Sequence, residues 1–253
     1  MQLSARLAWA TALSLMPVWA MATSTTVGLM PSYFEGSFGT TGSTRIWYLP
    51  AYVDYRGTEF GFKATIPYIQ VENRGALVSG GTVVGTGSNA STTESGLGDI
   101  WLKGSYTFHG QHGQPDIIPY LKIKLGTASA SQGLGTGQDD VEEGVEVDWT
   151  VGARVFPFIA VGYREVGSTA TYPLQNIATY EGGASVTVVP AHFLTAIFAG
   201  HQSEQPGFAP AADAIIAWNF SPPKGMGYSF YVDKGLSSGS PDYGVGVGLQ
   251  NRF

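Results

Sequence analysis

The sequence predicts an all-β fold, namely a transmembrane antiparallel up-and-down β-barrel of about twelve strands that follows a cleaved signal peptide. Three observations predict it. An apolar segment with a cleavage motif opens the chain, stretches of alternating apolar and polar residues recur after it, and short connections alternate with long ones. Together they describe a chain that is exported and then crosses a membrane with strands.

Residues 1–22 have the pattern of a secretory signal peptide. Arg6 supplies an early positive charge, residues 7–19 are mostly apolar, and Ala20-Met21-Ala22 is a small-residue motif of the kind that signal peptidase cleaves. The apolar run is shorter than the ~20 residues that a spanning helix needs, which argues against a retained N-terminal anchor. We therefore predict a signal peptide over 1–22 and an outer-membrane β-barrel over 23–253.

The composition excludes several classes of function. With no cysteine, the chain has no disulfides, no thiol catalysis and no cysteine-based metal site. With 13 Lys+Arg against 19 Asp+Glu, the net charge of −6 argues against a nucleic-acid partner. Charged residues make up only 13% of the chain and glycine is abundant, with 35 residues, which suits a barrel but also a secreted β-sandwich.

Alternation with a period of two residues identifies the strands. In the clearest case, residues 144–155, valines and other apolar residues share one face while Glu146, Asp148 and Arg154 share the other. The same pattern predicts twelve strands, an even number, as in single-chain bacterial barrels. They cover residues 24–34, 45–55, 58–70, 98–109, 117–127, 144–156, 157–167, 179–189, 192–202, 211–221, 227–236 and 242–253.

The lengths of the connections distinguish a barrel from a sandwich. Every second connection is short, and the others are longer and rich in Gly, Ser and Thr, as expected when short periplasmic turns alternate with external loops. The short set is Arg56-Gly57, His109–Pro115, a junction at Pro157, Pro190-Ala191 and Pro222–Met226. The long set is 35–44, 71–97, 128–143, 168–178, 203–210 and 237–241.

Aromatic residues near strand ends and the final residue agree with an outer-membrane location. Interfacial girdles would explain the pairs Trp47/Tyr48, Tyr106/Phe108, Phe156/Phe158 and Trp218/Phe220. Phe253 ends the last strand on its apolar face and resembles the signal that the outer-membrane assembly machinery reads. We therefore expect that machinery, outer-membrane lipid and lipopolysaccharide to be partners of the chain.

One stretch resembles a known family. Ser95-Gly-Leu-Gly-Asp-Ile100 leads into a strand, Lys122-Ile-Lys-Leu-Gly-Thr127 follows, and a glycine-rich segment over 133–140 comes next. This order resembles the outer-membrane transporter family named for the phenol meta-cleavage degradation pathway, although Leu125-Gly126-Thr127 stands where that family has Pro-Thr-Gly. The resemblance covers residues 95–148 and implies a barrel that passes small, aromatic molecules.

Charged residues on the polar faces of the strands are the predicted lining of the lumen. A basic set facing an acidic set would create a transverse field that orients dipolar or anionic solutes. Alternatively, the charges pair across strands and fill the lumen structurally. The basic set is Lys63, Lys103, Lys122, Lys124, Arg154 and Arg164, and the acidic set is Glu59, Asp99, Glu146, Asp148, Glu181, Asp213 and Asp233.

The predicted function is that of an outer-membrane channel for passive passage of small solutes, with aromatic or anionic solutes as candidates. Twelve tilted strands enclose a wall of ~12 Å radius, which leaves a passage of ~10 Å after the side chains are added. The long loop 71–97 either folds inward as a constriction or faces the medium. The sequence indicates no cofactor.

Two other classes of function stay open. His201 and Ser203 lie two residues apart, like the His-x-Ser pair of the outer-membrane phospholipase, although their predicted face is opposite to the lipid-facing one. A histidine on the surface beside a loop is the simpler interpretation. A structural or adhesion barrel that displays external loops is the other alternative. We predict no metal site, because the acidic run Asp139, Asp140, Glu142 and Glu143 does not match an EF-hand and is interpreted as a solvated loop.

Overall fold

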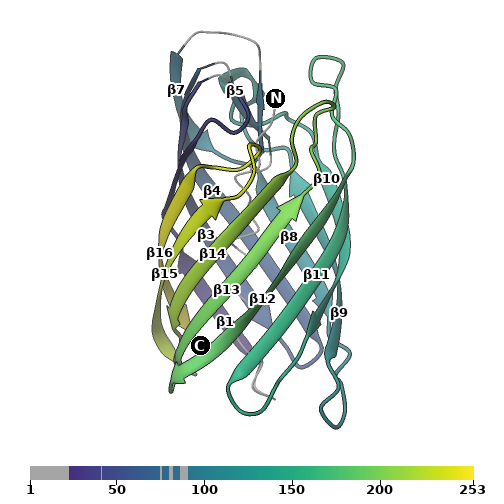
Figure 1. The fold of residues 1–253 in the computed structure, drawn as a ribbon, viewed down its shortest axis with the longest axis vertical. Helices are drawn as coiled ribbons and strands as arrows, with labels where there is room; N and C mark the ends of the chain where they lie inside the picture. Colours follow the sequence, from purple (N-terminus) through teal and green to yellow (C-terminus); the bar gives the residue numbers. More distant parts are fainter. Residues whose placement is uncertain (1–22, 41, 75, 80–81, 86–90) are drawn as a thin grey trace.

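The computed structural model describes residues 23–253, except for positions 41, 75, 80–81 and 86–90. The chain forms a barrel whose strands run obliquely around a common axis (Figure 1). Its strands are β1 (Ser24–Leu29), β2 (Ser32–Gly36), β3 (Thr44–Arg56), β4 (Phe60–Arg74), β5 (Ala76–Ser79), β6 (Thr82–Gly85), β7 (Ser91–Leu97), β8 (Ile100–Tyr106), β9 (Asp116–Leu125), β10 (Asp140–Asp148), β11 (Val155–Glu165), β12 (Ile177–Val189), β13 (His192–His201), β14 (Ala211–Phe220), β15 (Gly225–Gly235) and β16 (Tyr243–Arg252).

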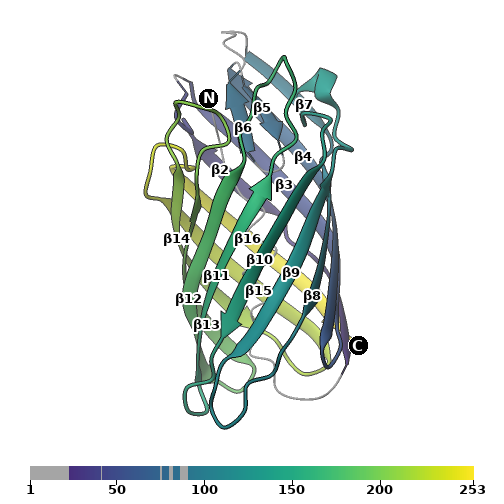
Figure 2. The same cartoon turned by 90° about the vertical axis from the view of Figure 1, so that its right-hand side faces the viewer.

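Within the described residues, the barrel wall has twelve antiparallel strands, as predicted. β1 and β2 both pair with β3 and with β16, so they are two halves of one barrel strand. β7 and β8 both pair with β4 and are likewise two halves of one strand. The pairing of β1 and β2 with β16 closes the sheet, while β5 and β6 form a separate hairpin near the upper end of β4 (Figure 2).

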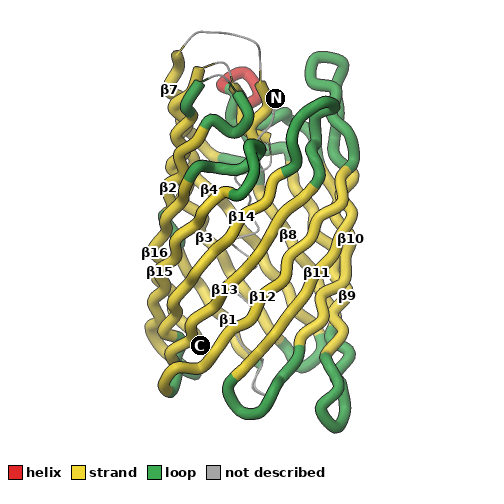
Figure 3. Tube along the Cα trace, in the orientation of Figure 1, coloured by secondary structure: helices red, strands yellow, loops and turns green. Residues whose placement is uncertain are grey.

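Short turns gather at one end of the barrel and long connections at the other, as predicted (Figure 3). The first and last strands meet at the short-turn end, where the N–H of Phe253 donates to the carbonyl of Thr25 at 2.9 Å. In outer-membrane barrels the short turns face the periplasm. We therefore call this the periplasmic end and the opposite one the outer end.

Two prolines explain why two of the barrel strands are interrupted. Pro50 and Pro67 lie directly opposite each other on β3 and β4. The N–H of Met30 donates to the carbonyl of Pro50 at 3.1 Å, and that of Gly98 to the carbonyl of Pro67 at 2.9 Å. Proline has no N–H to return either bond. The ladder is therefore incomplete where β1 gives way to β2 and where β7 gives way to β8.

The outer surface of the barrel is apolar, as a lipid-facing surface requires. Along β3, for example, Trp47, Leu49, Ala51 and Val53 are exposed, while Tyr48, Pro50 and Tyr52 between them are buried. Rings cluster near the periplasmic end, where the ring centroids of Phe60 and Tyr106 lie 4.9 Å apart. A closed barrel with this belt is an outer-membrane fold, in agreement with the predicted localisation. Among the described residues, no helix is long and apolar enough to cross a membrane.

Two predictions are wrong, namely the outward direction of part of the aromatic girdle and the position of one turn. Tyr48, Phe156 and Phe158 are buried and face the interior rather than the lipid. Residues 149–154 form the turn between β10 and β11, so Pro157 lies within a strand. The apolar alternation continues through this turn, and for that reason it was predicted as strand.

Two predicted loops are partly strand. β4 continues to Arg74 and β7 begins at Ser91, so much of 71–97 belongs to the wall or to the β5–β6 hairpin. β10 begins at Asp140, so Glu142 and Glu143 are strand residues rather than parts of a solvated acidic loop. Positions 75, 80–81 and 86–90 of the predicted loop lie outside the described residues.

Candidate functional site

Eleven of the thirteen predicted lining residues face the barrel interior. Alternate residues along the strands are buried, and the predicted charges fall on that inner face. The eleven are Lys63, Lys103, Lys122, Lys124, Arg164, Asp99, Glu146, Asp148, Glu181, Asp213 and Asp233. The other two, Glu59 and Arg154, are exposed in the periplasmic turns, so their prediction as lining residues is wrong.

Three of the lysines form a continuous row on neighbouring strands. Lys63 on β4 lies opposite Lys103 on β8, and Lys103 lies opposite Lys122 on β9. The row continues to an acidic residue at each end, Asp54 beside Lys63 and Glu142 beside Lys122. The inner wall therefore carries three adjacent cations in register.

Each lysine of this row lies over an aromatic ring. The Nζ atom of Lys63 is 4.7 Å from the ring centroid of Tyr52, and that of Lys103 is 4.5 Å from that of Tyr120. The Nζ atom of Lys122 is 4.5 Å from the Trp101 centroid. Such cation–π contacts hold the long side chains along the inner wall. We call these six residues the basic–aromatic stripe.

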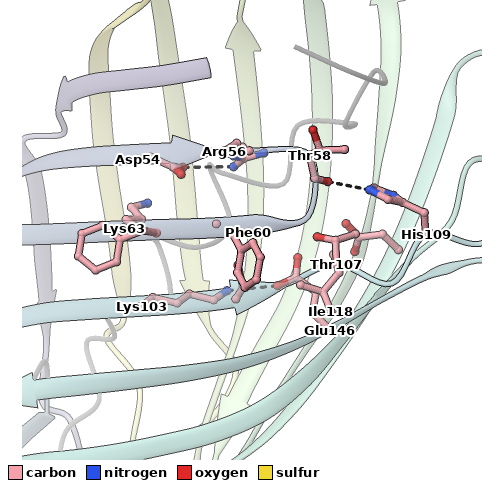
Figure 4. A pocket seen from close by; sticks show the side chains of 15 residues that line it. Asp54, Arg56, Thr58, Phe60, Lys63, Lys103, Thr107, His109, Ile118 and Glu146 are labelled. Atoms are coloured by element: carbon pink, nitrogen blue, oxygen red, sulfur yellow. Dashed lines mark hydrogen bonds and ion pairs between the residues drawn. The ribbon is translucent and has the colours of Figure 1, made fainter. Parts of the chain in front are cut away.

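The stripe borders a cavity at the periplasmic end. The cavity is lined by Lys63 and Lys103 together with Ser105, Ile118 and Asp148, among other residues (Figure 4). On its wall, Lys103 Nζ lies 3.3 Å from a carboxylate oxygen of Glu146. Positive and negative side chains therefore both line the cavity. The pairing of Lys103 with Glu146 neutralises part of the stripe, in line with the alternative in which the charges pair across strands.

Asp54 and Arg56 also line this cavity and were missed at the sequence level. They form an ion pair with a separation of 3.3 Å at the end of β3 (Figure 4). Asp54 and Arg56 alternate with outward residues in step with Tyr52, so they lie on the same inward face of β3. Between Ile46 and Tyr52 the inward face of β3 is apolar or aromatic, so the polar–apolar contrast that identified the other lining residues is absent there.

Lys124 is a structural residue and does not belong to the stripe. Its side chain is 0% exposed, and its Nζ atom lies 2.9 Å from a carboxylate oxygen of Asp140 and 3.8 Å from one of Asp99. The same Asp140 accepts a 2.9 Å hydrogen bond from the N–H of Gly167 in the loop after β11. This buried group therefore ties β9, β10, the break between β7 and β8, and one outer loop together.

Arg164 is a second buried anchor at the outer end. Its guanidinium lies 2.6 Å from Glu142 and 3.2 Å from Glu204, which is in the loop between β13 and β14. It also stacks against Trp101, with its Cζ atom 5.2 Å from the ring centroid. Glu142 and Glu204 were not predicted as lining residues, because both were assigned to loops.

The sequence motifs around residues 96–100 and 125–127 hold an outer loop against the inner wall. The hydroxyl of Thr127 donates to the carbonyl of Gly98 at 3.1 Å and accepts from the N–H of Ile100 at 3.1 Å. Asp99 accepts a 3.0 Å hydrogen bond from the N–H of Ala128. The loop therefore occupies the gap in the wall that Pro67 leaves, and Gly98 gains a partner for its carbonyl.

The same loop, residues 126–139, adds apolar side chains to the interior. Leu134 is 1% exposed, and Phe38 from the loop between β2 and β3 is 0% exposed. Both belong to one buried cluster with inward residues from the wall, including Phe34, Tyr48 and Tyr231. The outer half of the interior therefore combines apolar surface with buried charge.

The predicted hydrolase pair does not have the geometry of a nucleophile and its base. The hydroxyl of Ser203 donates its proton to the carbonyl of Gln205 at 2.7 Å, and His201 Nδ1 contacts the carbonyl oxygen of Gln202. A base must accept the nucleophile's proton. His201 is buried on the inner face, so its interpretation as a surface histidine is also wrong.

His109 links two periplasmic turns. Its Nε2 atom lies 2.7 Å from the carbonyl oxygen of Thr58, and its Nδ1 atom lies 3.2 Å from the carboxylate of Asp116. The contact with the Thr58 carbonyl, followed by that with Asp116, raises the pKa of His109, although partial burial opposes the shift. In the described part of the chain, no group of three or more His, Cys, Asp or Glu side chains could hold a metal ion.

Comparison with known proteins identifies the fold but not a family. No family model matches the chain, and no curated protein matches it. Solved structures do match. The COG4313 outer membrane channel from Pseudomonas putida F1 aligns with a TM-score of 0.69 and 12% identity, over 94% of this chain and 100% of that one.

Two further structures have similar scores. The NanC porin has a TM-score of 0.59 and 10% identity, over 89% of this chain and 98% of that one. The translocator domain of the autotransporter NalP from Neisseria meningitidis has a TM-score of 0.58 and 10% identity, over 97% and 93%. This chain has the fold of outer-membrane barrels. At these identities the likeness is one of fold, and the same fold serves channels, porins and a translocator.

Proposed function

We propose that this protein is a passive outer-membrane channel for small solutes. The observation that carries the proposal is the basic–aromatic stripe, in which Lys63, Lys103 and Lys122 follow one another in register along the inner wall. Residues that only fill a lumen do not need adjacent like charges, which repel each other. Adjacent cations above aromatic rings suit a solute that brings negative charge or a ring of its own.

We further propose that the favoured solutes are small aromatic or anionic compounds. The resemblance to the family named for phenol meta-cleavage implies the aromatic solutes, and the lysines of the stripe favour the anionic ones. The phenol-pathway family itself stays a prediction. An anionic group would contact the lysines of the stripe, and a planar ring would stack on Tyr120 or Trp101. The exposed Phe253 at the end of β16 and the apolar belt suit the assembly machinery, lipid and lipopolysaccharide as partners.

Single-channel recording tests the proposal. The refolded mature protein in a planar bilayer with concentrated KCl should give steady openings, and benzoate should block them more strongly than its neutral analogue benzyl alcohol. A folded barrel without openings would contradict the channel function. Equal block by the two compounds would leave the channel function in place but contradict the preference for anions.

The alternative function, that of a lipid hydrolase, is disfavoured because the Ser203 hydroxyl donates its proton to the backbone carbonyl of Gln205. Phospholipid hydrolysis by the native protein that is lost in Ser203→Ala would restore this alternative.

A further inference from the structure

Two carboxylates lie next to each other on the inner wall away from the stripe. Asp213 on β14 lies opposite Gly235 on β15, and Ile215 lies opposite Asp233. The two acidic residues are therefore diagonal neighbours on one face of two paired strands, close enough for their charges to repel each other. Asp213 is the third residue of β14 and Asp233 is the third from the end of β15, which places both near the outer end of the lumen.

Asp233 is buried without a hydrogen-bond donor among the described residues. The residue is 4% exposed, and neither of its carboxylate oxygens has a hydrogen-bond partner there. The adjacent Lys234 offsets the charge of Asp233 only in part, because its side chain is exposed and donates to the carbonyl of Asp242 at 2.8 Å. A buried carboxylate stays ionised only with donors or a counter-charge, so the ionised form of Asp233 favours a cation supplied from outside the chain.

Aromatic rings lie beside Asp233 because β16 has glycines at its inward positions. A Cβ atom on Gly244 would lie 2.5 Å from Phe34 Cδ1 and 3.2 Å from Asp233 Cβ. A Cβ atom on Gly246 would lie 2.1 Å from Tyr231 Cε1. The rings of Phe34 and Tyr231 therefore cover the bare backbone of β16 beside Asp233.

A second polar atom in this region also lacks a partner. The hydroxyl of Tyr48 is buried without a hydrogen bond among the described residues, and Tyr48 belongs to the same apolar cluster as Phe34, Tyr231 and Ile215. Two separate buried polar side chains, Asp233 and Tyr48, thus offer acceptors within one apolar and aromatic region. A ligand that fits must donate hydrogen bonds and carry an apolar body.

A metal ion fits this chemistry poorly, whereas an organic ammonium fits it well. Magnesium and calcium take six or more oxygen ligands, and the walls here are largely apolar. An ammonium group satisfies carboxylates with N–H donors and is attracted to the faces of aromatic rings. A hydrocarbon or aryl body attached to it would pack against Phe34 and Ile215.

We propose that Asp213 and Asp233, with Phe34 and Tyr231, form a subsite at the outer end of the lumen that binds the ammonium group of small organic amines. This subsite rests on the proposed channel function, and it lies on other strands than the basic–aromatic stripe. The lumen then has an amine subsite at its outer end, and the basic–aromatic stripe lies on the opposite part of the wall.

Calorimetric binding to the refolded mature protein in detergent tests the subsite. The probe is 2-phenylethylammonium, and its neutral control is 2-phenylethanol, which has a similar body without the charge. Native protein should bind the amine at least about tenfold more tightly than the alcohol, a difference of ~1.4 kcal/mol. The double variant Asp213→Asn, Asp233→Asn should lose that preference. Glu165→Gln, which removes one charge from the outer face of β11, should keep it.

Equal affinity of the native protein for the two compounds, or no amine binding, would overturn the subsite even if the double variant fails to fold. A folded double variant that keeps the preference for the amine would overturn it as well. The two proposals fail separately. A barrel that is silent in bilayers but binds the amine contradicts only the channel function, and an open channel that ignores the amine contradicts only the subsite.

Discussion

The backbone N–H of Ala128 donates a 3.0 Å hydrogen bond to the carboxylate of Asp99. This bond joins the first residues of an outer loop to the break between β7 and β8, and Asp99 also lies 3.8 Å from Lys124. The loop 126–139 is therefore attached to the inner wall by a charged acceptor rather than by apolar contact alone. Because Leu134 of this loop is buried in the interior, the loop occupies part of the outer half of the barrel.

Substitution of Asp99 by Ala should release this loop. A hydrogen bond to a charged group contributes ~1.5–3 kcal/mol, so the Ala128 amide should exchange with solvent about ten to a hundred times faster. Hydrogen exchange followed by mass spectrometry measures this directly. Ser131→Ala in the same loop is the matched control, because the Ser131 side chain contacts only Ser129 among the interactions described. Equal exchange in the two variants would show that Asp99 does not hold the loop.

Charge reversal of Lys122 should shift ion selectivity towards cations, because its ammonium group faces the lumen beside Trp101. Lys122→Met should shift it in the same direction by a smaller amount. The measurement is the reversal potential under a KCl gradient. Lys224→Glu, in an exposed periplasmic turn, is the matched control and should cause a much smaller shift. Equal shifts for the two reversals would mean that net charge, and not the stripe, sets selectivity.

Replacement of Lys124 by Met should destabilise the barrel by ~3–5 kcal/mol, because Asp140 would remain as a buried charge without its ion-pair partner. The double variant Lys124→Met, Asp140→Asn should recover part of the loss. The free energy of unfolding of both variants is measured in urea, with the gel mobility of the folded barrel as the signal. If the single variant unfolds like the native protein, the pair does not stabilise the outer end.

The His109 link should make the periplasmic turn sensitive to pH. The folded-state pKa of His109 lies above its ordinary value of 6.5. Its stabilising contribution is therefore fully present below about pH 6.5 and is lost as the pH rises through the raised value. The protection factor of the Gly110 amide, which donates to Asp116 at 2.9 Å, reports on the turn, because it compares the exchange rate with that of an unstructured chain at the same pH.

His109→Gln should abolish this pH dependence. His112→Asn in the same turn is the control, since His112 has a positive φ of 55° that asparagine tolerates. A native turn whose exchange has the same pH profile as that of the His109 variant would contradict the link.

Alternation predicted the wall and most of its inner face, because lipid outside and polar groups inside impose opposite chemistry on successive residues. Lys103 and Lys122 were found in this way. The pattern fails where a strand leaves the lipid. Residues 91–97 form β7 at the outer end, where water on the outside removes the need for an apolar face. Their Gly, Ser and Thr residues therefore suggested a loop.

The contacts across the lumen could not be predicted in the same way. Glu204 is far from Arg164 in sequence and comes from a loop, so no periodicity connects them. In the turn 149–154, Val151 and Ala153 continue the apolar alternation, and the positive φ of 63° at Gly152 marks the reversal. Sequence alternation carries no information about such a conformation.

The opposed prolines on β3 and β4 have a consequence for the mechanics of the wall. Pro50 and Pro67 each remove one ladder hydrogen bond, and the losses fall on both sides of the same strand pair. A closed β-sheet under tension separates most easily between the strands that share the fewest hydrogen bonds. Under lateral tension from the bilayer, this four-strand sector should therefore deform first, while the eight remaining strands keep their curvature.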